Sequence, residues 1–261
     1  MRILLFSDSF YPEKNSAAKL LYDFSEYVSF QKKCDIDVFT ISRNRTKSEG
    51  LNYKVFSCIL RDYRGKSNLL RGILEFYSGI YFIFLHLRYK FGCKYEYIIY
   101  YNPSVLQFVF LMYLRVFYPK SKFILILRDI FPDWAIELGI IRAKPLIAFL
   151  VFCKKINIWL ADTIFCESKN KLALIKSQFP KSDVKILYNW TNFKELKRRS
   201  KISKKYKHFI YAGNIGEAQD LLSCSKFINS LINKGHKVDF YSSGSHLEEL
   251  QHKLGFNKNL R

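Results

Sequence analysis

The sequence predicts an α/β protein with a doubly wound, parallel sheet. Short apolar runs of strand length alternate with longer segments whose apolar residues recur at helical spacing. Apolar residues make up 49% of the 261 residues, which is enough to bury a substantial core. Because parallel strands need crossover helices, this alternation favours a sheet with helices packed on its faces.

The elements of a first domain, residues 1–190, follow in order. An apolar run opens the chain as a strand, and a segment with helical spacing follows it. Asn-Pro-Ser at residues 102–104 is a helix start signal, so the segment after it is expected to be helical. The strands expected are residues 2–6, 35–41, 53–60, 95–101, 122–127, 163–166 and 184–187. The helices expected are residues 16–30, 105–118, 146–160 and 169–179.

Residues 191–207 interrupt this alternation. They hold eight Lys and Arg residues and one Glu, which is typical of a solvated linker. Residues 208–261 then return to strand and helix, as the start of a second Rossmann-like domain. The elements expected there are strands 208–212 and 237–241 and helices 217–234 and 245–255.

The second domain is short for its class. Residues 208–261 hold two strand–helix units, whereas such domains usually take about 100–150 residues. We therefore expect a chain that is truncated at its C-terminus or whose second domain a partner chain completes.

The charge balance points to anionic partners. Lys and Arg number 43 against 22 Asp and Glu, a net charge of +21. Nucleic acid, anionic lipid and diphosphate-bearing substrates all fit such a field. The densest basic run is a linker with few aromatic residues and no nucleic-acid motif is present, so we expect no nucleic-acid partner.

Cysteine usage and the N-terminus indicate a cytoplasmic protein. None of the six cysteines forms a CxxC pair or has a His at zinc-ligand spacing. The first apolar run is too short for a signal peptide and lacks a small-residue cleavage site.

Residues 72–87 form a long apolar segment with Glu75 inside it and Arg71 and Arg88 at its ends. Sixteen residues fall short of the roughly 20 that a spanning helix needs. A buried core helix, a helix in the membrane interface and an inserted helix all remain open. With the positive charge and 17% aromatic residues, we favour peripheral attachment to the anionic inner face of the cytoplasmic membrane.

Ligands of open parallel sheets bind beyond the carboxyl ends of the strands. Polar residues follow four expected strands at this edge: Asp8 and Ser9, Asn102, Arg128 and Asp129, and Glu167 and Ser168. We expect them to line one cleft.

Asp129 is the best candidate for a catalytic base or for a carboxylate that orients a hydroxyl. It ends the run KFILIL and leads into a turn that contains Pro132 and Trp134. Its alternatives are to cap the next turn or to pair with Arg128. Trp134 could stack on a sugar face or pack in the core, and Asp133 suits a helix cap better than a catalyst.

A second candidate site lies in residues 212–217, where a strand runs through Gly213, Asn214 and Gly216 to Glu217 and an expected helix. Such a loop can present backbone N–H groups to phosphate. A tight turn without ligand remains the alternative, because a GxxG spacing alone is a weak signal.

The sequence offers little support for a metal site or a hydrolase. Asp35 and Asp37 form a DxD sequence, but they open an expected strand, where one acid is usually solvated and the other faces the sheet edge. No His occurs in an HExxH motif or with a Ser or Cys elbow, and His86 is expected in the core or at an interface.

With these residues in place, the chain resembles bacterial glycosyltransferase family 4, which has the GT-B fold. It is most similar to the O-antigen and capsule enzymes that transfer amino sugars of the N-acetylfucosamine type. The matching segments occur in the family's order: MRILLFSDSFYPE, LRDIFPDWAIELGII, ADTIFCES, KILYNWTN and YAGNIGEAQDL.

The resemblance implies retaining transfer from a nucleotide sugar, usually UDP-linked, to a lipid-linked or glycan acceptor, without a metal or other cofactor. It implies that Arg128 and Asp129 line the acceptor-side cleft with Asp8, Ser9, Asn102 and Trp134. The loop of Gly213, Asn214, Gly216 and Glu217 would bind the donor diphosphate.

The chain departs from the family in three places. Its first loop reads Asn-Ser-Ala-Ala at residues 15–18 where glycines are usual, and Asn214 and Gln219 stand near positions that often hold Arg and Lys. The family's paired-glutamate donor motif would lie beyond Arg261. We therefore expect negligible turnover by this chain alone, and a non-catalytic binding or assembly subunit is the alternative.

Overall fold

The computed structural model describes residues 1–13, 15–43, 53–60, 68–90, 92–101, 104–190 and 207–255. The chain divides into two compact units, Met1–Phe193 and Lys194–Arg261, and each is described by itself. The predicted linker at residues 191–207 lies outside the described residues except for Lys207.

The first unit contains a seven-stranded sheet in the order β3-β2-β1-β4-β5-β6-β7. Every neighbouring pair is parallel, so the predicted doubly wound sheet is confirmed. The strand order reverses between β1 and β4, where Ile3 pairs with Tyr97. The strands are β1 (Arg2–Ser7), β2 (Asp35–Ser42), β3 (Lys54–Ile59), β4 (Tyr97–Tyr101), β5 (Lys122–Leu127), β6 (Thr163–Cys166) and β7 (Val184–Ile186).

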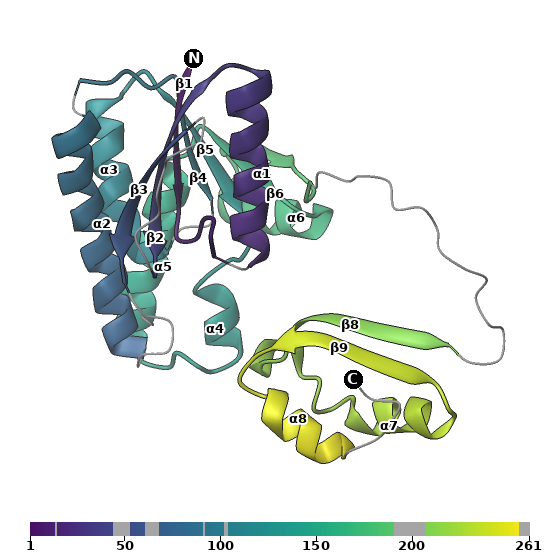
Figure 1. Ribbon diagram of the computed structural model, residues 1–261. Coiled ribbons are helices and arrows are strands. Elements are labelled where there is room, and N and C mark those ends of the chain that lie inside the picture. Colours follow the sequence, from purple (N-terminus) through teal and green to yellow (C-terminus); the bar gives the residue numbers. More distant parts are fainter. Residues whose placement is uncertain are drawn as a thin grey trace. The chain divides into compact units, whose positions relative to one another are not determined.

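Helices cover both faces of this sheet, and Figure 1 shows α1 on one face with α2 and α3 side by side on the other. The segment 105–118 begins with a 3-10 turn, η2, and Ser104 caps it by accepting a hydrogen bond from the Leu106 N–H, as its sequence predicts. The helices are α1 (Ser16–Gln31), α2 (Asn68–Lys90), η2 (Val105–Gln107), α3 (Phe108–Phe117), α4 (Asp133–Glu137), α5 (Lys144–Trp159) and α6 (Lys169–Gln178).

The sheet divides the apolar core into two layers because alternate side chains point to opposite faces. Leu4 and Phe6 of β1 pack with α2 and α3, whereas Ile3 and Leu5 pack with α1. The ring of Phe6 lies 5.4 Å from that of Phe82 and 5.1 Å from that of Phe110, both edge-on. Part of the high aromatic content is therefore core packing.

The DxD sequence at the start of β2 is structural. Asp37 is buried, and its carboxylate lies 2.5 Å from the Lys90 ammonium and accepts a hydrogen bond of 2.9 Å from the Tyr95 hydroxyl. Asp35 is exposed. Asp35 is thus the expected solvated acid, whereas Asp37 differs from the expected sheet-edge position, because it is buried on β2, which lies between β1 and β3.

The second unit is built on a parallel pair, β8 (His208–Asn214) and β9 (Lys237–Ser243). Its small core gathers Ile215, Ile228, Ile232, Val238, Leu250 and Leu254. The remaining elements are η3 (Glu217–Gln219), α7 (Ser225–Asn233) and α8 (Leu247–Leu254).

The helix expected from residue 217 is wrong over its first turns. Only a 3-10 turn forms at Glu217–Gln219, and the α-helix begins at Ser225. Asp220 adopts a left-handed conformation with φ 42°, which a continuous α-helix excludes, and its carboxylate accepts a hydrogen bond from the Ser223 hydroxyl. This local turn chemistry overrides the apolar periodicity.

Candidate functional site

The carboxyl ends of the strands of the first unit carry the residues that the sequence singles out. Asp8 and Ser9 follow β1, and Arg128 and Asp129 follow β5, with β4 between them in the sheet. Asn102, predicted at the end of β4, lies outside the described residues. The parallel sheet thus brings the other four to one edge.

The turn after β1 is held by its own side chains. Ser9 is buried, its N–H donates to the Ser7 hydroxyl, and its hydroxyl accepts a bond of 2.6 Å from the Asn15 amide. The Asn15 carbonyl oxygen in turn accepts a bond from the Ala18 N–H and caps α1. The Asn15 side chain therefore holds the first loop against Ser9 and caps α1, although this loop has no glycine-rich sequence.

An open hollow of about 540 Å³ lies beside this turn, at the start of α1. Asp8 follows β1 and is half-buried, and it is not among the residues that line this hollow. The hollow is lined by Tyr11, Pro12, Glu13, Asn15, Ser16 and Lys19.

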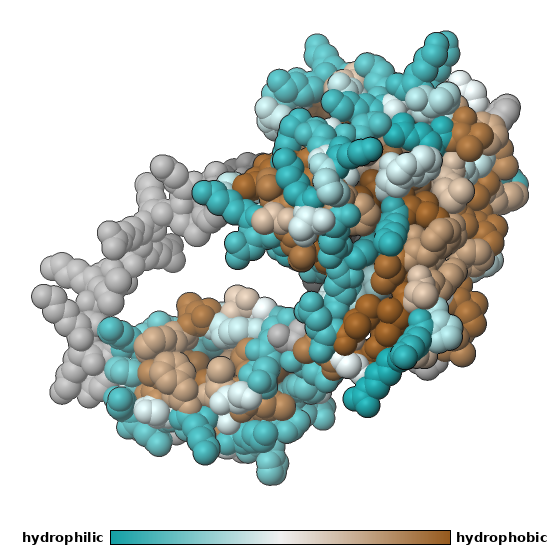
Figure 2. All heavy atoms as spheres, turned by 180° about the vertical axis from the view of Figure 1, so that it is seen from behind, coloured by the Kyte–Doolittle hydropathy of each residue, from teal (hydrophilic) through white to brown (hydrophobic). Residues whose placement is uncertain are grey.

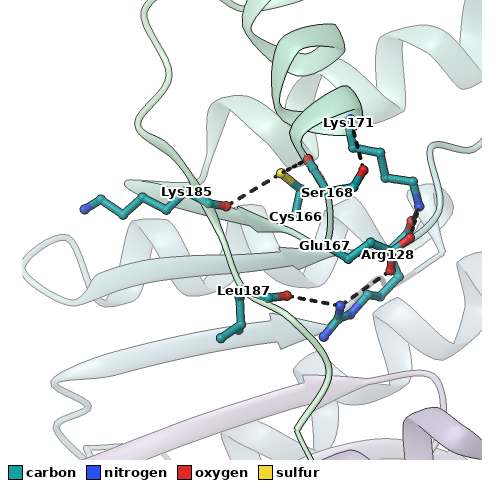
Figure 3. A network of polar contacts seen from close by, with 7 residues as sticks. All are labelled: Arg128, Cys166, Glu167, Ser168, Lys171, Lys185 and Leu187. Carbon is teal, nitrogen blue, oxygen red and sulfur yellow. Dashed lines mark hydrogen bonds and ion pairs between the residues drawn. The ribbon is translucent and has the colours of Figure 1, made fainter.

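Arg128 is the centre of the polar network that Figure 3 shows. Its side chain is buried, with 7% of the residue exposed, and Nη1 lies 3.5 Å from Oε2 of Glu167 and 3.3 Å from the Leu187 carbonyl oxygen. These partners follow β6 and β7, so one guanidinium links the ends of three neighbouring strands.

Two aromatic rings enclose the same guanidinium. Its carbon lies 5.7 Å from the ring centroid of Tyr101 and 5.9 Å from that of Trp190. Burial raises the pKa of Tyr101, and the nearby Arg128 charge opposes that rise. Both rings are absent from the residues predicted for the site, although Trp190 lies in the segment KILYNWTN that carries the resemblance.

Lys171 completes the network from α6. Its ammonium contacts the Glu167 carboxylate and the Arg128 carbonyl oxygen, and Ser168 caps the helix on which it lies (Figure 3). Glu167 is thus placed between two cations. Because Arg128 is buried, its side chain holds the ends of β5, β6 and β7 together and does not extend into solvent.

Asp129 and Trp134 are the accessible residues of this group. Asp129 is exposed at the end of β5, and Trp134 is 42% exposed on α4, with its ring tilted against Phe131. Trp134 is therefore available to a ligand and is not a core residue. An exposed carboxylate can bond the hydroxyls of a sugar, and an exposed aromatic face can stack on its ring.

The expected cap role of Asp133 is wrong. Pro132 occupies the cap position of α4, and the Asp133 carboxylate accepts bonds of 2.7 and 2.9 Å from the Lys154 ammonium. Lys154 is buried on α5, so this pair ties α4 to α5 and fixes the turn that carries Trp134.

In the second unit, the loop residues are placed differently from the prediction. Gly213 and Asn214 are the last residues of β8, Gly216 is buried and Glu217 is exposed in η3. The Asn214 amide donates a bond of 3.1 Å to Gln219, so both polar residues of the loop contact each other. The turn starts at Ile215.

A third glycine, Gly244, which sequence reasoning missed, shapes this loop. Gly244 follows β9 with φ +144°, and a Cβ there would meet the Ile215 carbonyl oxygen at 2.2 Å. The Ile215 N–H donates to the Ser243 carbonyl and the His246 N–H donates to the Ile215 carbonyl. The sequence SSGSH after an expected strand was the available signal.

The two loops therefore form one surface at the carboxyl end of the β8–β9 pair. Backbone groups of both loops face each other there, and α8 begins at Leu247 directly after the second loop. Backbone N–H groups beside a helix start suit an anion such as a diphosphate. In the ranges that the structure describes, no three His, Cys, Asp or Glu side chains are grouped closely enough to hold a metal ion.

No protein-family model matches the chain, and no curated protein matches it significantly. Solved structures do. The sucrose-phosphate synthase from Thermosynechococcus elongatus has a TM-score of 0.62 at 10% identity, covering 100% of this chain and 69% of that one. The lipopolysaccharide outer core galactosyltransferase WaaB, in its apo form, has a TM-score of 0.59 at 14% identity, covering 100% and 67%.

Arabidopsis thaliana UGT89C1, complexed with UDP-L-rhamnose, has a TM-score of 0.56 at 9% identity, covering 97% of this chain and 67% of that one. At these identities the likeness concerns the fold. These structures have the GT-B fold, so the predicted fold class, a Rossmann-like domain followed by the beginning of a second one, is confirmed. The chain has a glycosyltransferase-like fold.

Proposed function

We propose that the chain binds a nucleotide sugar and serves in glycosyl transfer, with the donor on the second unit and the acceptor on the first. The observation that carries this proposal is the joined surface of the 215–217 and 244–246 loops, in a chain whose fold is that of UDP-sugar-binding and sugar-transferring proteins. Two glycine-containing loops at the carboxyl ends of adjacent parallel strands suit a diphosphate.

The finer assignment rests on the resemblance of the five sequence segments. It comprises a UDP-linked donor, retention of configuration, a lipid-linked or glycan acceptor and a role in bacterial O-antigen or capsule assembly in the cytoplasm. WaaB, named as a lipopolysaccharide outer core galactosyltransferase, has a similar fold, and this supports the choice of surface polysaccharide.

The residues divide the work as follows. The amides of Gly216 and Glu217 bind the diphosphate without a metal ion, and Asn214 borders it. Asp129 orients or deprotonates the acceptor hydroxyl, and Trp134 stacks on the acceptor ring. Arg128 acts as a positioning residue, because its guanidinium already contacts Glu167, the Leu187 carbonyl oxygen and two aromatic rings.

Titration calorimetry with UDP, using UMP and inorganic diphosphate for comparison, tests the donor assignment. We expect UDP to bind and Asn214→Ala to weaken it several-fold, roughly a 1 kcal/mol loss, since one polar contact is removed. Asn233→Ala, at an exposed Asn at the end of α7 in the same unit, should leave binding unchanged. No heat with UDP, or equal loss in both variants, contradicts the proposal.

Release of UDP from UDP-sugars then separates the two functional classes. Release that needs an added lipid-linked or glycan acceptor identifies transfer. Binding of UDP without any release favours the alternative of a non-catalytic subunit.

A further inference from the structure

The outer side of α2 is apolar, unlike that of an ordinary surface helix, and the side packed on the sheet combines apolar residues such as Phe82 with buried polar ones. Its large exposed apolar side chains recur every three to four residues, which makes one continuous stripe along the helix. They are Leu69, Leu70, Ile73, Phe76, Tyr77, Ile80, Phe84, Leu87 and Tyr89.

The polar residues on the inner side of α2 fasten the helix to its own unit. Glu75 pairs with Arg71 at 2.8 Å and accepts a 2.5 Å bond from the Ser104 hydroxyl, which lies just after β4. Ser78 accepts a bond of 2.8 Å from the Gln107 amide. The bonds to Ser104 and Gln107 would be lost if the helix left the sheet.

Further along α2, His86 is buried between two tyrosines. Its ring nitrogens lie 2.9 Å from the Tyr113 hydroxyl and 2.7 Å from the Tyr118 hydroxyl. Lys90 pairs with buried Asp37. By length and composition, α2 is the one described helix that is apolar enough to cross a membrane. These bonds nevertheless hold it against the first unit, in the helix layer on one face of the sheet.

The apolar stripe continues onto the neighbouring helices. α2 contacts η2 and α3, and α3 contacts α5. Figure 2 shows apolar residues gathered over this side of the first unit. The exposed apolar residues added by α3 and α5 are Met112, Val116, Phe117, Leu146, Phe149, Phe152 and Trp159. We call the outer sides of α2, α3 and α5 the docking face.

The docking face carries basic charge and no exposed acid. Glu75 is the sole acidic residue in the three helices, and it is buried. Exposed Arg88 stands at one end of α2, and exposed Lys144 and Lys155 stand on α5. Cations at the margins of an apolar, aromatic-rich surface complement an anionic lipid headgroup layer.

We propose that the docking face binds the surface of an anionic lipid bilayer, with α2 lying in the interface and not spanning it. Charge selects this occupant over a second copy of the chain, because two such basic faces in a chain of net charge +21 would repel. The Ser104–Glu75 bond places the first turns of α2 at the carboxyl edge of the sheet, so the bilayer surface reaches the edge that holds Asp129.

This inference does not depend on the proposed function, because vesicle binding needs neither donor nor acceptor. The full chain is floated with vesicles of phosphatidylcholine alone and of phosphatidylcholine mixed with phosphatidylglycerol, at low and high salt. We expect binding to the mixed vesicles that weakens with salt. Free protein should be monomeric by light scattering.

Two matched variants place the contact. Phe84→Asp changes a residue that is 52% exposed on α2, and Phe30→Asp changes one that is 67% exposed on α1, over the opposite face of the sheet. We expect Phe84→Asp to lower the vesicle partition about tenfold and Phe30→Asp to leave it unchanged. Both variants should keep the circular dichroism and melting temperature of the parent.

Fluorescence gives an independent readout. Trp159 on the docking face is 78% exposed, so its emission should shift to the blue when mixed vesicles are added, and Trp159→Phe should remove most of that shift while binding persists. Three results would overturn the proposal. They are no binding of the chain to mixed vesicles, a stable dimer that becomes monomeric in Phe84→Asp, and an equal decrease of the vesicle partition in both Asp variants.

Discussion

The indole of Trp190 lies against the guanidinium of Arg128, with 5.9 Å between the ring centroid and the guanidinium carbon. The indole N–H also donates a bond of 3.0 Å to the Leu20 carbonyl oxygen of α1. One residue at the end of the first unit thus joins the helix on one face of the sheet to the strand ends that carry the candidate site.

Trp190→Phe keeps an aromatic ring beside Arg128 and removes the bond to Leu20. We expect the free energy of unfolding to fall by about 1 kcal/mol, the usual net value of one hydrogen bond. Urea denaturation measures this change. Trp159→Phe is the control and should stay within about 0.5 kcal/mol, because that ring is exposed; an equal cost at both positions would count against the role of Trp190.

The ion pair between Asp133 and Lys154 predicts an asymmetric pair of mutants. Asp133→Asn leaves a buried ammonium with Gln178 at 3.2 Å as a weaker partner, so we expect a loss of about 3 kcal/mol. Lys154→Met leaves a carboxylate that is closer to solvent and should cost about 1 kcal/mol. The reverse order in denaturation experiments would refute the assignment.

His86 predicts a pH dependence of stability. Burial lowers its pKa to about 4 in the folded chain, against 6.5 for a free histidine. Below about pH 6.5, His86 is therefore protonated in the unfolded chain and stays neutral in the folded chain. The free energy of unfolding falls as the pH decreases toward about 4. Between about pH 7 and about pH 5 the loss should be roughly 2 kcal/mol.

His86→Gln keeps polar atoms near Tyr113 and Tyr118 and removes the titration. Its unfolding free energy should therefore change less between the two pH values than that of the parent chain. His252→Gln, at an exposed His of α8, should retain the parent's pH dependence. Identical pH profiles for the parent and His86→Gln would show that another group is responsible.

A side chain at position 244 should clash with Ile215, and comparison with Gly255 separates this clash from backbone strain. Gly244→Ala places a Cβ 2.2 Å from the Ile215 carbonyl oxygen, and Gly255→Ala, also at positive φ, meets nothing within 4 Å. We expect the second unit to lose about 1 kcal/mol with Gly255→Ala and clearly more with Gly244→Ala. Amide exchange in residues 207–255 measures both, and equal effects would mean that the loops are not in tight contact.

The sequence predicted the sheet well because apolar strands and helical spacing are local signals. The bounds of β5 and β6 agree with those expected, Lys122–Leu127 and Thr163–Cys166, since both runs are bordered by polar residues. The failure at residue 217 has a local cause as well: the left-handed Asp220 ends a helical pattern that apolar spacing alone continues.

The site was harder to predict because its contacts join distant parts of the chain. Asp129 and Arg128 follow a strand end, and position alone finds them. The stacking of Trp190 on Arg128 spans 62 positions, and the approach of Gly244 to Ile215 depends on how two loops meet. No spacing in the sequence encodes either contact. The roles of Asp8, Ser9, Asn102, Asp129 and the donor loop in catalysis stay predictions.

The central claim, donor binding at the joined loops, is tested most directly by amide chemical shifts of the labelled chain during titration with UDP-N-acetylglucosamine. We expect the amides of Ile215, Gly216 and Glu217 and of residues 244–246 to shift together and to saturate, with UDP alone shifting the same set. Shifts confined to other residues, or none at all, would contradict the account.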